Sequence, residues 1–507
     1  MKRICGFGKK KRIMIPVSGI KVMSLVSLAV PVFLFNMLFL KWYVGLISNV
    51  SLLMSIFIYC RRLLLKNALP PDGKNRQEFS LSASSLAVCV ILALSWTWLS
   101  GIGGYFTQSP DFNNRNALLH DMLNHSWPVY FEGTDCALTY YIGYWIVPAI
   151  IGKAGGAVFG QSLSWPVANA ALYLQTVWFL LLVFLLLLSV CNRRERVGRV
   201  LLVFIFFSGM DGMMCFLRND WSPHIEWWAE TWQYSSLTTS FFWVFNQAVP
   251  AWIVTLLFLH SVGETWSYAL IGLVCTIYSP LPLVGLAVLC VGCFAISLIH
   301  QKEKGKEWKQ VFSPVNICAL IAMIPVFLYL TSNHAAGGDP FRLEFFRDRY
   351  PTASRYLFRF GLFLLMEWGF YAAVVFSRFK KDPVFLLTCI SLALIPLIKM
   401  GENYNDFPMR ASIPGLVIIC VYCIRFLSET PNHQGRFLSF VLVAALAIGT
   451  FTPLTEIKRG ADLFRANGSP VIEDDRGTIL NSEIDVPYFI CSEVTENFFY
   501  KYFAKGK

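Results

Sequence analysis

The stretch ALYLQTVWFLLLVFLLLLSV, from Ala171 to Val190, contains no charged residue. A helix of roughly 20 such residues is long enough to cross the ~30 Å hydrocarbon core of a bilayer. Within lipid only helices and closed barrels satisfy their own backbone, and this run is continuously apolar, whereas barrel strands alternate. The stretch therefore predicts a membrane-spanning helix.

The rest of the chain has the matching composition. Of its 507 residues, 56% are hydrophobic, 16% aromatic and only 15% charged, which is too apolar for an ordinary water-soluble domain. Further apolar windows predict spans near residues 21–40, 43–60, 82–103, 200–217, 241–261, 313–332, 355–377, 384–399, 412–427 and 437–453. Residues 268–299 are too long for one crossing, and prolines at 280 and 282 divide them into two short helices that meet near the outer face. We expect an all-α polytopic membrane protein with about 13 transmembrane helices, each near the roughly 20-residue length of a crossing.

The positive charge follows this predicted topology. The net charge of +12 comes from Lys and Arg residues that cluster in short segments between apolar runs. Such segments stay in the cytoplasm, so their positions indicate how the chain is oriented in the membrane. We therefore expect membrane lipids as partners and no nucleic acid. The pattern predicts a cytoplasmic N-terminus and an external C-terminus.

The topology divides the chain into three parts. Residues 1–81 form a basic cytoplasmic N-terminus with two extra transmembrane helices, residues 82–453 the membrane core, and residues 454–507 a small external tail. External loops of the core are predicted at residues 104–168, 218–240, 333–354 and 400–411.

Two details of the external segments stay open. The aromatic stretch from Tyr140 to Lys153 is predicted to lie along the outer interface, with a further span as the alternative. Cys136 and Cys491 both fall in external segments, where two unpaired thiols are favoured over a disulfide.

The first external polar segment centres on Asp111, just after the predicted span at 82–103. A carboxylate there could act as general base on an acceptor hydroxyl, or bind a divalent ion that neutralises a phosphate leaving group. The alternative is an acid that caps the helix containing His120 and Asp121.

A second polar cluster combines acids, a histidine and large aromatics. His224, Glu226 and Glu230 lie among Trp221, Trp227, Trp228, Trp232 and Tyr234. Aromatic faces beside hydrogen-bonding groups suit sugar rings, whereas a membrane-interface belt explains the aromatics alone. Both interpretations stay open.

Asp211 precedes this cluster inside an apolar run. An acid in lipid costs several kcal/mol unless it is paired, so we expect a functional or structural role for it. Gly209 and Gly212 permit close backbone approach or a helix break there.

A third cluster, at residues 401–410, ends in Arg410 at the start of a predicted helix. Its guanidinium could bind a lipid-linked phosphate through two parallel hydrogen bonds. The alternative is an ion pair with Asp406, one turn earlier. Arg347 lies in another external loop with an excess of arginines, which either the same anionic ligand or local acid pairs should hold.

In this layout the sequence resembles the GT-C superfamily of membrane glycosyltransferases, which use polyprenyl-phosphate-linked sugars. The resemblance covers roughly residues 82–453 and rests on Asp111, Tyr140 to Lys153, Ala171 to Val190 and the basic segment Arg193 to Arg199, in that order. A single Asp111 stands where some members carry paired acids, which leaves the identity of the catalytic acid less well defined.

The chain is also similar to a group of uncharacterised bacterial polytopic membrane proteins at Asn124 to Pro128, Asn246 to Pro250, Ser279 to Leu281 and Asn405 to Pro414. This similarity implies no activity. It favours a multi-pass protein of the bacterial cytoplasmic (inner) membrane.

The GT-C resemblance implies transfer from a lipid-linked sugar donor to an envelope glycan, lipid or protein on the external face. It implies Asp111 as the catalytic residue, and Arg410 and Arg347 as ligands of the donor phosphate. The candidate acid or metal partners are Asp121, Asp135 and Asp211. The candidate acceptor or sugar contacts are His224, Glu226, Trp227, Trp228, Glu230, Asn405 and Asp406. A divalent cation, Mg²⁺ or Mn²⁺, is a candidate cofactor.

Two other functions compete with this one. A transporter or flippase of lipid-linked saccharide needs charged residues along a path through the membrane, and Asp211 and Glu367 are the acids inside predicted spans. A non-catalytic scaffold fits any polytopic chain but explains the external polar clusters least.

Overall fold

The computed structural model of the chain is built almost entirely of helices. It describes residues 12–68, 78–191, 197–221, 224–230, 232–300, 304–333, 342–343, 352–399, 406–428, 433–472, 477–481 and 486–506. Within these ranges, eight helical segments are long and apolar enough to cross a membrane. They are Val17–Leu38 (α1), Trp42–Leu65 (in α2, Trp42–Ala68), Gln161–Val190 (η2, Gln161–Leu163, and α6, Ser164–Val190), Leu237–Leu259 (α9), Pro280–Ile299 (in α11, Pro280–His300), Pro314–Thr331 (α13), Ala353–Phe379 (α15, Ala353–Leu364, η6, Leu365–Gly369, and α16, Phe370–Phe379) and Gly435–Asn467 (α20, His433–Gly449, and α21, Phe451–Asn467).

Shorter elements complete the bundle. Apolar helices of intermediate length are α3 (Ala83–Leu99), α5 (Gly143–Phe159), α17 with η7 (Pro383–Leu394 and Ile395–Leu397) and α19 (Ile413–Ser428). The remaining helices are η1 (Ile102–Gly104), α4 (Phe112–Asn124), α7 (Val197–Ile205), α8 (Asp211–Arg218), η3 (Ile225–Ala229), η4 (Thr265–Ser267), α10 (Tyr268–Leu273), α12 (Lys304–Val311), α18 (Asp406–Ala411), η8 (Ile479–Asn481), η9 (Val486–Tyr488) and α22 (Phe498–Tyr502). Three antiparallel ribbons pair β1 (Arg12–Pro16) with β2 (Glu78–Ser82), β3 (Cys136–Leu138) with β6 (Ile490–Ser492), and β4 (Arg342–Leu343) with β5 (Ile398–Lys399).

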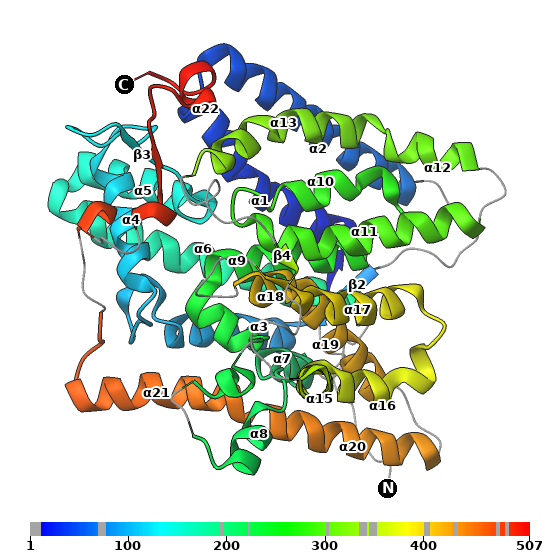
Figure 1. Cartoon of the computed structure of the whole chain (residues 1–507). Coiled ribbons are helices and arrows are strands. Elements are labelled where there is room, and N and C mark those ends of the chain that lie inside the picture. The colour runs from blue at the N-terminus through cyan, green and yellow to red at the C-terminus, as the bar shows by residue number, and fades with distance from the viewer. Residues whose placement is uncertain are drawn as a thin grey trace, which may run out of the picture.

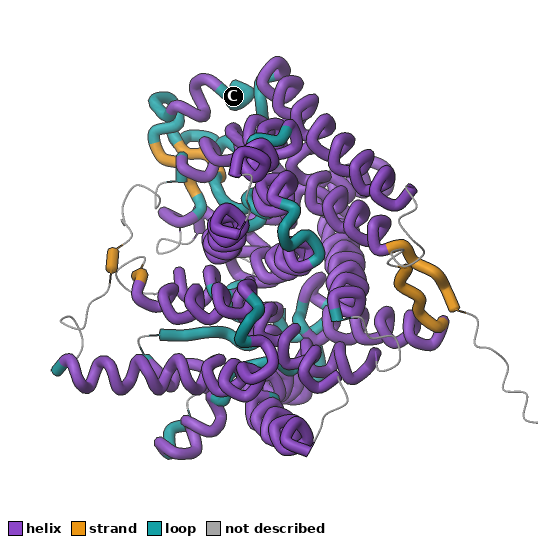
Figure 2. Tube along the Cα trace, turned by 90° about the vertical axis from the view of Figure 1, so that its right-hand side faces the viewer, coloured by secondary structure: helices purple, strands orange, loops and turns teal. Residues whose placement is uncertain are grey.

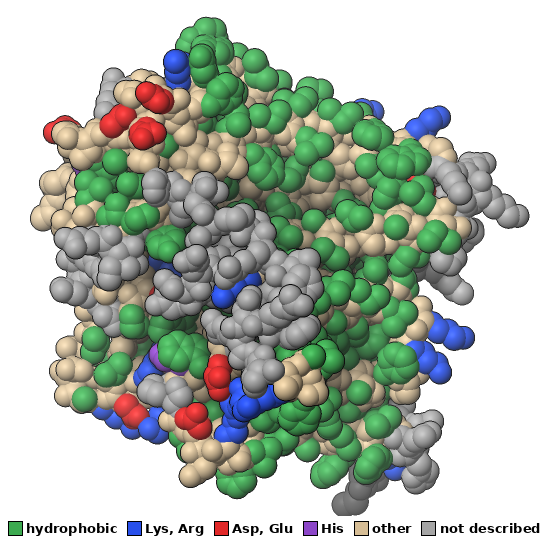
Figure 3. All heavy atoms as spheres, in the orientation of Figure 1, with side chains coloured by type: hydrophobic (Ala, Val, Ile, Leu, Met, Phe, Trp, Pro, Cys, Tyr) green, Lys and Arg blue, Asp and Glu red, His purple; other side chains and the backbone are tan. Residues whose placement is uncertain are grey.

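The long helices lie side by side, so the bundle has two ends (Figure 1). One end carries α4, β3 and α22, and we call it the tail face because the C-terminal tail after α21 covers part of it; the other end, with β2 and α12, is the opposite face. The strands lie at the periphery of the bundle (Figure 2). Apolar side chains cover much of the visible surface, and most of the visible acidic side chains gather toward the tail face (Figure 3).

The C-terminal tail is tied to the first two helices. The backbone N–H of Lys505 donates to the Phe39 carbonyl at 2.9 Å, and the Lys41 ammonium donates to the Lys501 carbonyl at 2.8 Å. The predicted tail, starting at 454, therefore packs on the membrane helices, and its first residues continue α21 up to Asn467.

The β3–β6 ribbon determines the directions in which Cys136 and Cys491 point. Cys136 is paired with Ser492, and Ala137 with Cys491. Because directly paired residues share one side of a ribbon, the two cysteines point to opposite sides. Both thiols are free in the structure.

The predicted span near 200–217 is not a continuous helix. In the segment near 200–217, α7 ends at Ile205 and α8 begins at Asp211. The N–H of Leu237 donates to the Phe207 carbonyl at 3.1 Å, and the N–H of Met210 to the Met366 carbonyl at 2.9 Å. The break is tolerated because neighbouring segments satisfy these freed backbone groups.

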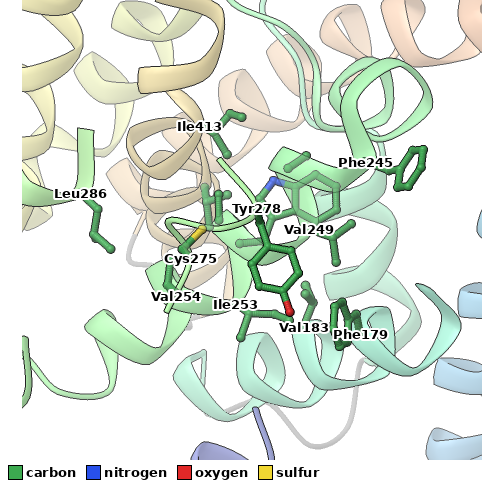
Figure 4. Close-up of a cluster of buried hydrophobic side chains, with 14 of the residues drawn as sticks. Phe179, Val183, Phe245, Val249, Ile253, Val254, Cys275, Tyr278, Leu286 and Ile413 are labelled. Atoms are coloured by element: carbon green, nitrogen blue, oxygen red, sulfur yellow. The ribbon is translucent and has the colours of Figure 1, made fainter. Parts of the chain in front are cut away.

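The segment at 268–299 does form two helices, α10 and α11, but they meet inside the bundle. The Tyr278 hydroxyl, between them, donates to the Leu28 carbonyl in the middle of α1 at 3.2 Å. Figure 4 shows this tyrosine among buried side chains that include Phe179, Val183 and Ile253. The expectation of a junction near the outer face is therefore wrong, because Tyr278 is anchored in the apolar core.

The stretch from Tyr140 to Lys153 contributes most of α5. This helix begins where the N–H of Gly143 donates to the Ile277 carbonyl at 3.0 Å, beside the α10–α11 junction. It then runs against α6, and Gly152 approaches the Ala168 methyl so closely that an added Cβ would lie 2.7 Å from it. This stretch is thus packed within the protein along much of its length.

Candidate functional site

A glycine turn carries the chain from α3 to Asp111. Gly101 and Gly103 have φ angles of +79° and +84°, and a Cβ on Gly101 would lie 2.5 Å from the Thr107 carbonyl oxygen. Other residues are strained in this conformation. Asp111 directly precedes α4, yet its side chain makes no capping hydrogen bond. The interpretation of Asp111 as a helix cap is therefore wrong.

Asp111 instead pairs with Arg115, one turn along α4. Nη2 of Arg115 donates to the Asp111 carboxylate at 2.9 Å. The Arg115 side chain is 8% exposed and that of Asp111 is 41% exposed. Burial lowers the pKa of Arg115, and the Asp111 carboxylate opposes that shift. Nη1 of Arg115 has no hydrogen-bond partner within the described part of the chain.

Arg410 of α18 joins this pair. Arg115 interacts electrostatically with Asp111, Tyr140 and Arg410. Tyr140 likewise interacts with Asp111 and with both arginines. Arg410 lies 3.7 Å from Asp406, so the predicted ion pair is present but longer than a hydrogen bond. We call Asp111, Arg115, Tyr140 and Arg410 the arginine site.

Asp121 and Asp135 hold the C-terminal tail instead. The Asp121 carboxylate accepts the N–H of Ile479 at 2.9 Å, and burial raises its pKa. The Asp135 carboxylate accepts the Thr495 hydroxyl at 2.9 Å. The structure thus gives both acids partners in the tail rather than in the arginine site.

Asp211 belongs to a second polar group, buried inside the bundle. Nε1 of Trp228 donates to Asp211 at 2.9 Å and to Glu367 at 3.1 Å. The hydroxyls of Ser208 and Thr452 donate to the second Asp211 oxygen at 3.1 and 2.9 Å. The carboxyls of Asp211 and Glu367 also interact electrostatically with each other.

Irregular backbone brings these carboxyls together. Glu367 lies in η6, a π-helical segment, and such segments occur frequently at functional sites. Gly209 lies in the gap between α7 and α8, where a Cβ would collide with the Glu367 carboxylate. Glycine is therefore the residue that lets this gap approach η6.

Glu226 of η3 extends the group. Its carboxylate accepts the N–H of Ser236 at 2.8 Å and the Gln233 amide at 2.9 Å. Burial raises the pKa of Glu226 to about 8, and the Asp211 carboxylate adds to this shift. We call Asp211, Glu226 and Glu367, with Trp228, the carboxyl cluster.

A pocket of about 210 Å³ is lined by residues that lie close in sequence to members of both groups. Its lining includes Pro110, next to Asp111, and His224, two residues before Glu226. Because α21 contributes a large part of the wall, we call it the α21 pocket.

The charged groups of the α21 pocket are held in fixed positions. The Glu456 carboxylate accepts from the Trp243 indole at 2.9 Å and from the Arg459 guanidinium at 2.8 Å. The guanidinium also covers the Trp243 ring, with its carbon 4.9 Å from the ring centroid. Nη1 of Arg459 lies 3.4 Å from Nδ1 of His224. Burial, followed by the Arg459 charge, lowers the pKa of His224.

Two residues of the tryptophan-rich loop face outward. Trp227 is 56% exposed and its ring lies 4.5 Å from the His224 ring. Glu230 lies 3.8 Å from Arg218 and 3.5 Å from Arg359. Asn405 and Arg347 fall outside the described residues.

The donor groups at Asp111 suit an anion better than a divalent cation. No three Asp, Glu, His or Cys side chains of the described ranges form a set of metal ligands. The charged partner of Asp111 is the Arg115 guanidinium, and a cation there disfavours a second cation. We therefore derive no step through Mg²⁺ or Mn²⁺.

Sequence reasoning missed three members of these groups, Arg115, Glu456 and Arg459. Arg115 could have been found from its spacing to Asp111, since residues four apart on a helix are neighbours. Glu456 and Arg459 lie beyond the predicted end of the last span, where α21 in fact continues. Glu367 was visible as an acid in a span, but its partner Asp211 is distant in sequence.

Comparison with protein-family models, with curated proteins and with solved structures finds no match for this chain.

Proposed function

We propose that the chain is a GT-C-like membrane glycosyltransferase of the bacterial inner membrane, with about 13 spans by the roughly 20-residue criterion. In this proposal the tail face is external, and a sugar passes there from a polyprenyl-phosphate donor to an envelope glycan, lipid or protein. The observation that carries it is Asp111, a partly exposed carboxylate that pairs with a buried guanidinium and directly follows Pro110, a residue of the α21 pocket lining.

The arginine site supports the donor half of the reaction. Arg115 has an unused donor at Nη1, and Arg410 lies near it. Two guanidiniums can hold the lipid phosphate and stabilise its charge as the sugar–oxygen bond breaks. Their fixed positions reduce the reorganisation needed at that moment.

Asp111 supports the acceptor half. Its exposed carboxylate can accept the proton of an acceptor hydroxyl while the hydroxyl oxygen bonds to the anomeric carbon. The electron pair of the broken bond leaves with the lipid phosphate. Attack from the face opposite the phosphate inverts the anomeric configuration.

The test is transfer by the variant Asp111→Asn, assayed in membranes with polyprenyl-phosphate sugars. General-base catalysis typically contributes about 10²–10⁴-fold, so we expect a loss of that size. The control is Asp462→Asn, because Asp462 is 48% exposed on α21 and pairs with the exposed Lys458. Undiminished transfer by Asp111→Asn would remove Asp111 from the mechanism.

The carboxyl cluster supports one alternative, a proton-coupled transporter or flippase of lipid-linked saccharide. Asp211 and Glu367 both accept from the Trp228 indole inside the bundle, and protonatable acids at such depth mark proton relays in transporters. The discriminating measurement is movement of lipid-linked saccharide across proteoliposomes with and without a pH gradient. Gradient-driven movement that Glu367→Gln abolishes, with no sugar transfer, would favour the alternative.

A further inference from the structure

The α21 pocket offers one site of defined size next to Asp111. Its volume is about 210 Å³, below the roughly 300–1,000 Å³ of pockets that take drug-sized ligands. We propose that this pocket binds a single uncharged pyranose ring, the acceptor sugar of the transferase. This inference rests on the proposed function and names the substrate class of that site.

The wall of the pocket has the mixed character that sugar rings require. Trp243 and Phe242 supply aromatic surface, while Gln108, Ser109 and Glu456 supply hydrogen-bonding groups. Sugars present C–H faces to aromatics and hydroxyls to polar groups, so one ring can satisfy both kinds of wall.

The charges of the pocket balance, which argues for a neutral ligand. Glu456 and Arg459 neutralise each other at 2.8 Å. His224 titrates below its ordinary pKa of 6.5, because of burial and the Arg459 charge, and is uncharged at pH 7. A uronic acid would bring an uncompensated carboxylate into this lining, whereas a neutral hexose would not.

The position of the pocket links it to the reacting groups. Ser109 and Pro110 line it, and Asp111 follows directly, with consecutive Cα atoms about 3.8 Å apart. In this proposal a ring in the pocket directs its reacting hydroxyl toward the Asp111 carboxylate. The catalytic carboxylate, Asp111, does not line the pocket. Substitutions in the lining and at Asp111 can therefore test binding and catalysis separately.

The experiment is binding of methyl pyranosides to the purified full chain in nanodiscs, measured by calorimetry. The panel contains neutral glucoside, galactoside, mannoside and N-acetylglucosaminide, with methyl glucuronide as the charged comparison. We expect at least one neutral glycoside to bind with millimolar affinity, the range for a ligand of one ring. The glucuronide should bind at least about tenfold more weakly.

Three variants test the location. Glu456→Gln keeps the shape but loses the charge, and Leu463→Trp fills the pocket from a side chain that is 41% exposed and so is tolerated by the fold. Both should weaken binding at least about tenfold. Trp221→Ala, a 51% exposed residue that does not line the pocket, should bind as the wild type does.

The outcomes separate this inference from the proposed function. Asp111→Asn should bind the glycoside normally while losing transfer. Glycoside binding without any transfer would retain the pocket and refute the transferase. The pocket inference is overturned if no neutral glycoside binds at about 50 mM, if the glucuronide binds best, or if Leu463→Trp leaves binding unchanged.

Discussion

The arginine site and the carboxyl cluster solve the same problem in opposite ways. In the first, Asp111 pairs with Arg115 and remains 41% exposed. In the second, Asp211 and Glu367 are buried, and the Trp228 indole donates to both. The comparison teaches that an acid paired with a guanidinium stays accessible from outside, whereas acids held by an indole are closed off by packing.

The largest expected effect is on the rate of sugar transfer. It is expected for Arg410→Gln, which removes one guanidinium of the arginine site. Removing a donor aimed at developing charge costs about 10²–10³-fold in rate. The assay is transfer from polyprenyl-phosphate sugar in membranes. Arg465→Gln, on the exposed side of α21, is the matched control. Equal rates for both variants would exclude Arg410 from phosphate binding.

A smaller effect is expected in the carboxyl cluster, on stability rather than on chemistry. Trp228→Phe removes the indole donor from both Asp211 and Glu367. Each buried group left unsatisfied costs about 1–3 kcal/mol. Thermal unfolding of the protein in detergent should show a lower midpoint. Trp227→Phe, 56% exposed, should leave the midpoint within error, and equal shifts would contradict the indole bridge.

A third effect concerns the pH dependence of stability through Glu226. Burial raises the pKa of this carboxyl from 4.5 to about 8, with Asp211 and Glu456 adding to the shift. The folded state therefore holds this proton more tightly than the unfolded state, so the stabilisation is complete below pH 4.5 and is lost as the pH rises to about 8. The unfolding midpoint should fall across this range, and less steeply in Glu226→Gln. Parallel profiles would show that Glu226 is not the titrating group.

The smallest effect is expected from surface charge. Asp462→Asn breaks an ion pair in which the Lys458 and Asp462 side chains are 75% and 48% exposed. Exposed pairs contribute about 0–1 kcal/mol. The unfolding midpoint should move by less than it does in Trp228→Phe, and a larger shift would mean that α21 depends on this pair.

The spans were predictable because lipid accepts little except long apolar helices. Ala171 to Val190 is helical throughout, within α6. Asp211 was recognisable for the same reason, since an acid in an apolar run needs a partner. Its partners were not recognisable, because Glu367 and Thr452 lie far away in sequence and meet it only through packing.

The breaks in the helices were harder to predict. The segment near 200–217 is apolar enough for a span, yet it divides because Gly209 must approach Glu367. Likewise, the hydropathy around residue 453 falls while α21 continues to Asn467. An apolar window indicates that a residue is in an apolar environment. Where a helix ends depends instead on which neighbouring segment hydrogen-bonds to its free backbone N–H and C=O groups.

The π-helical segment η6 places two buried polar contacts on one face of a helix. Glu367 lies in η6 and accepts from the Trp228 indole at 3.1 Å. Downstream of η6, Tyr371 donates to the Ser208 carbonyl at 2.9 Å. Residues four apart are neighbours on a helix surface, so the tryptophan-rich loop and the gap between α7 and α8 are both bound to the same side of this one helix.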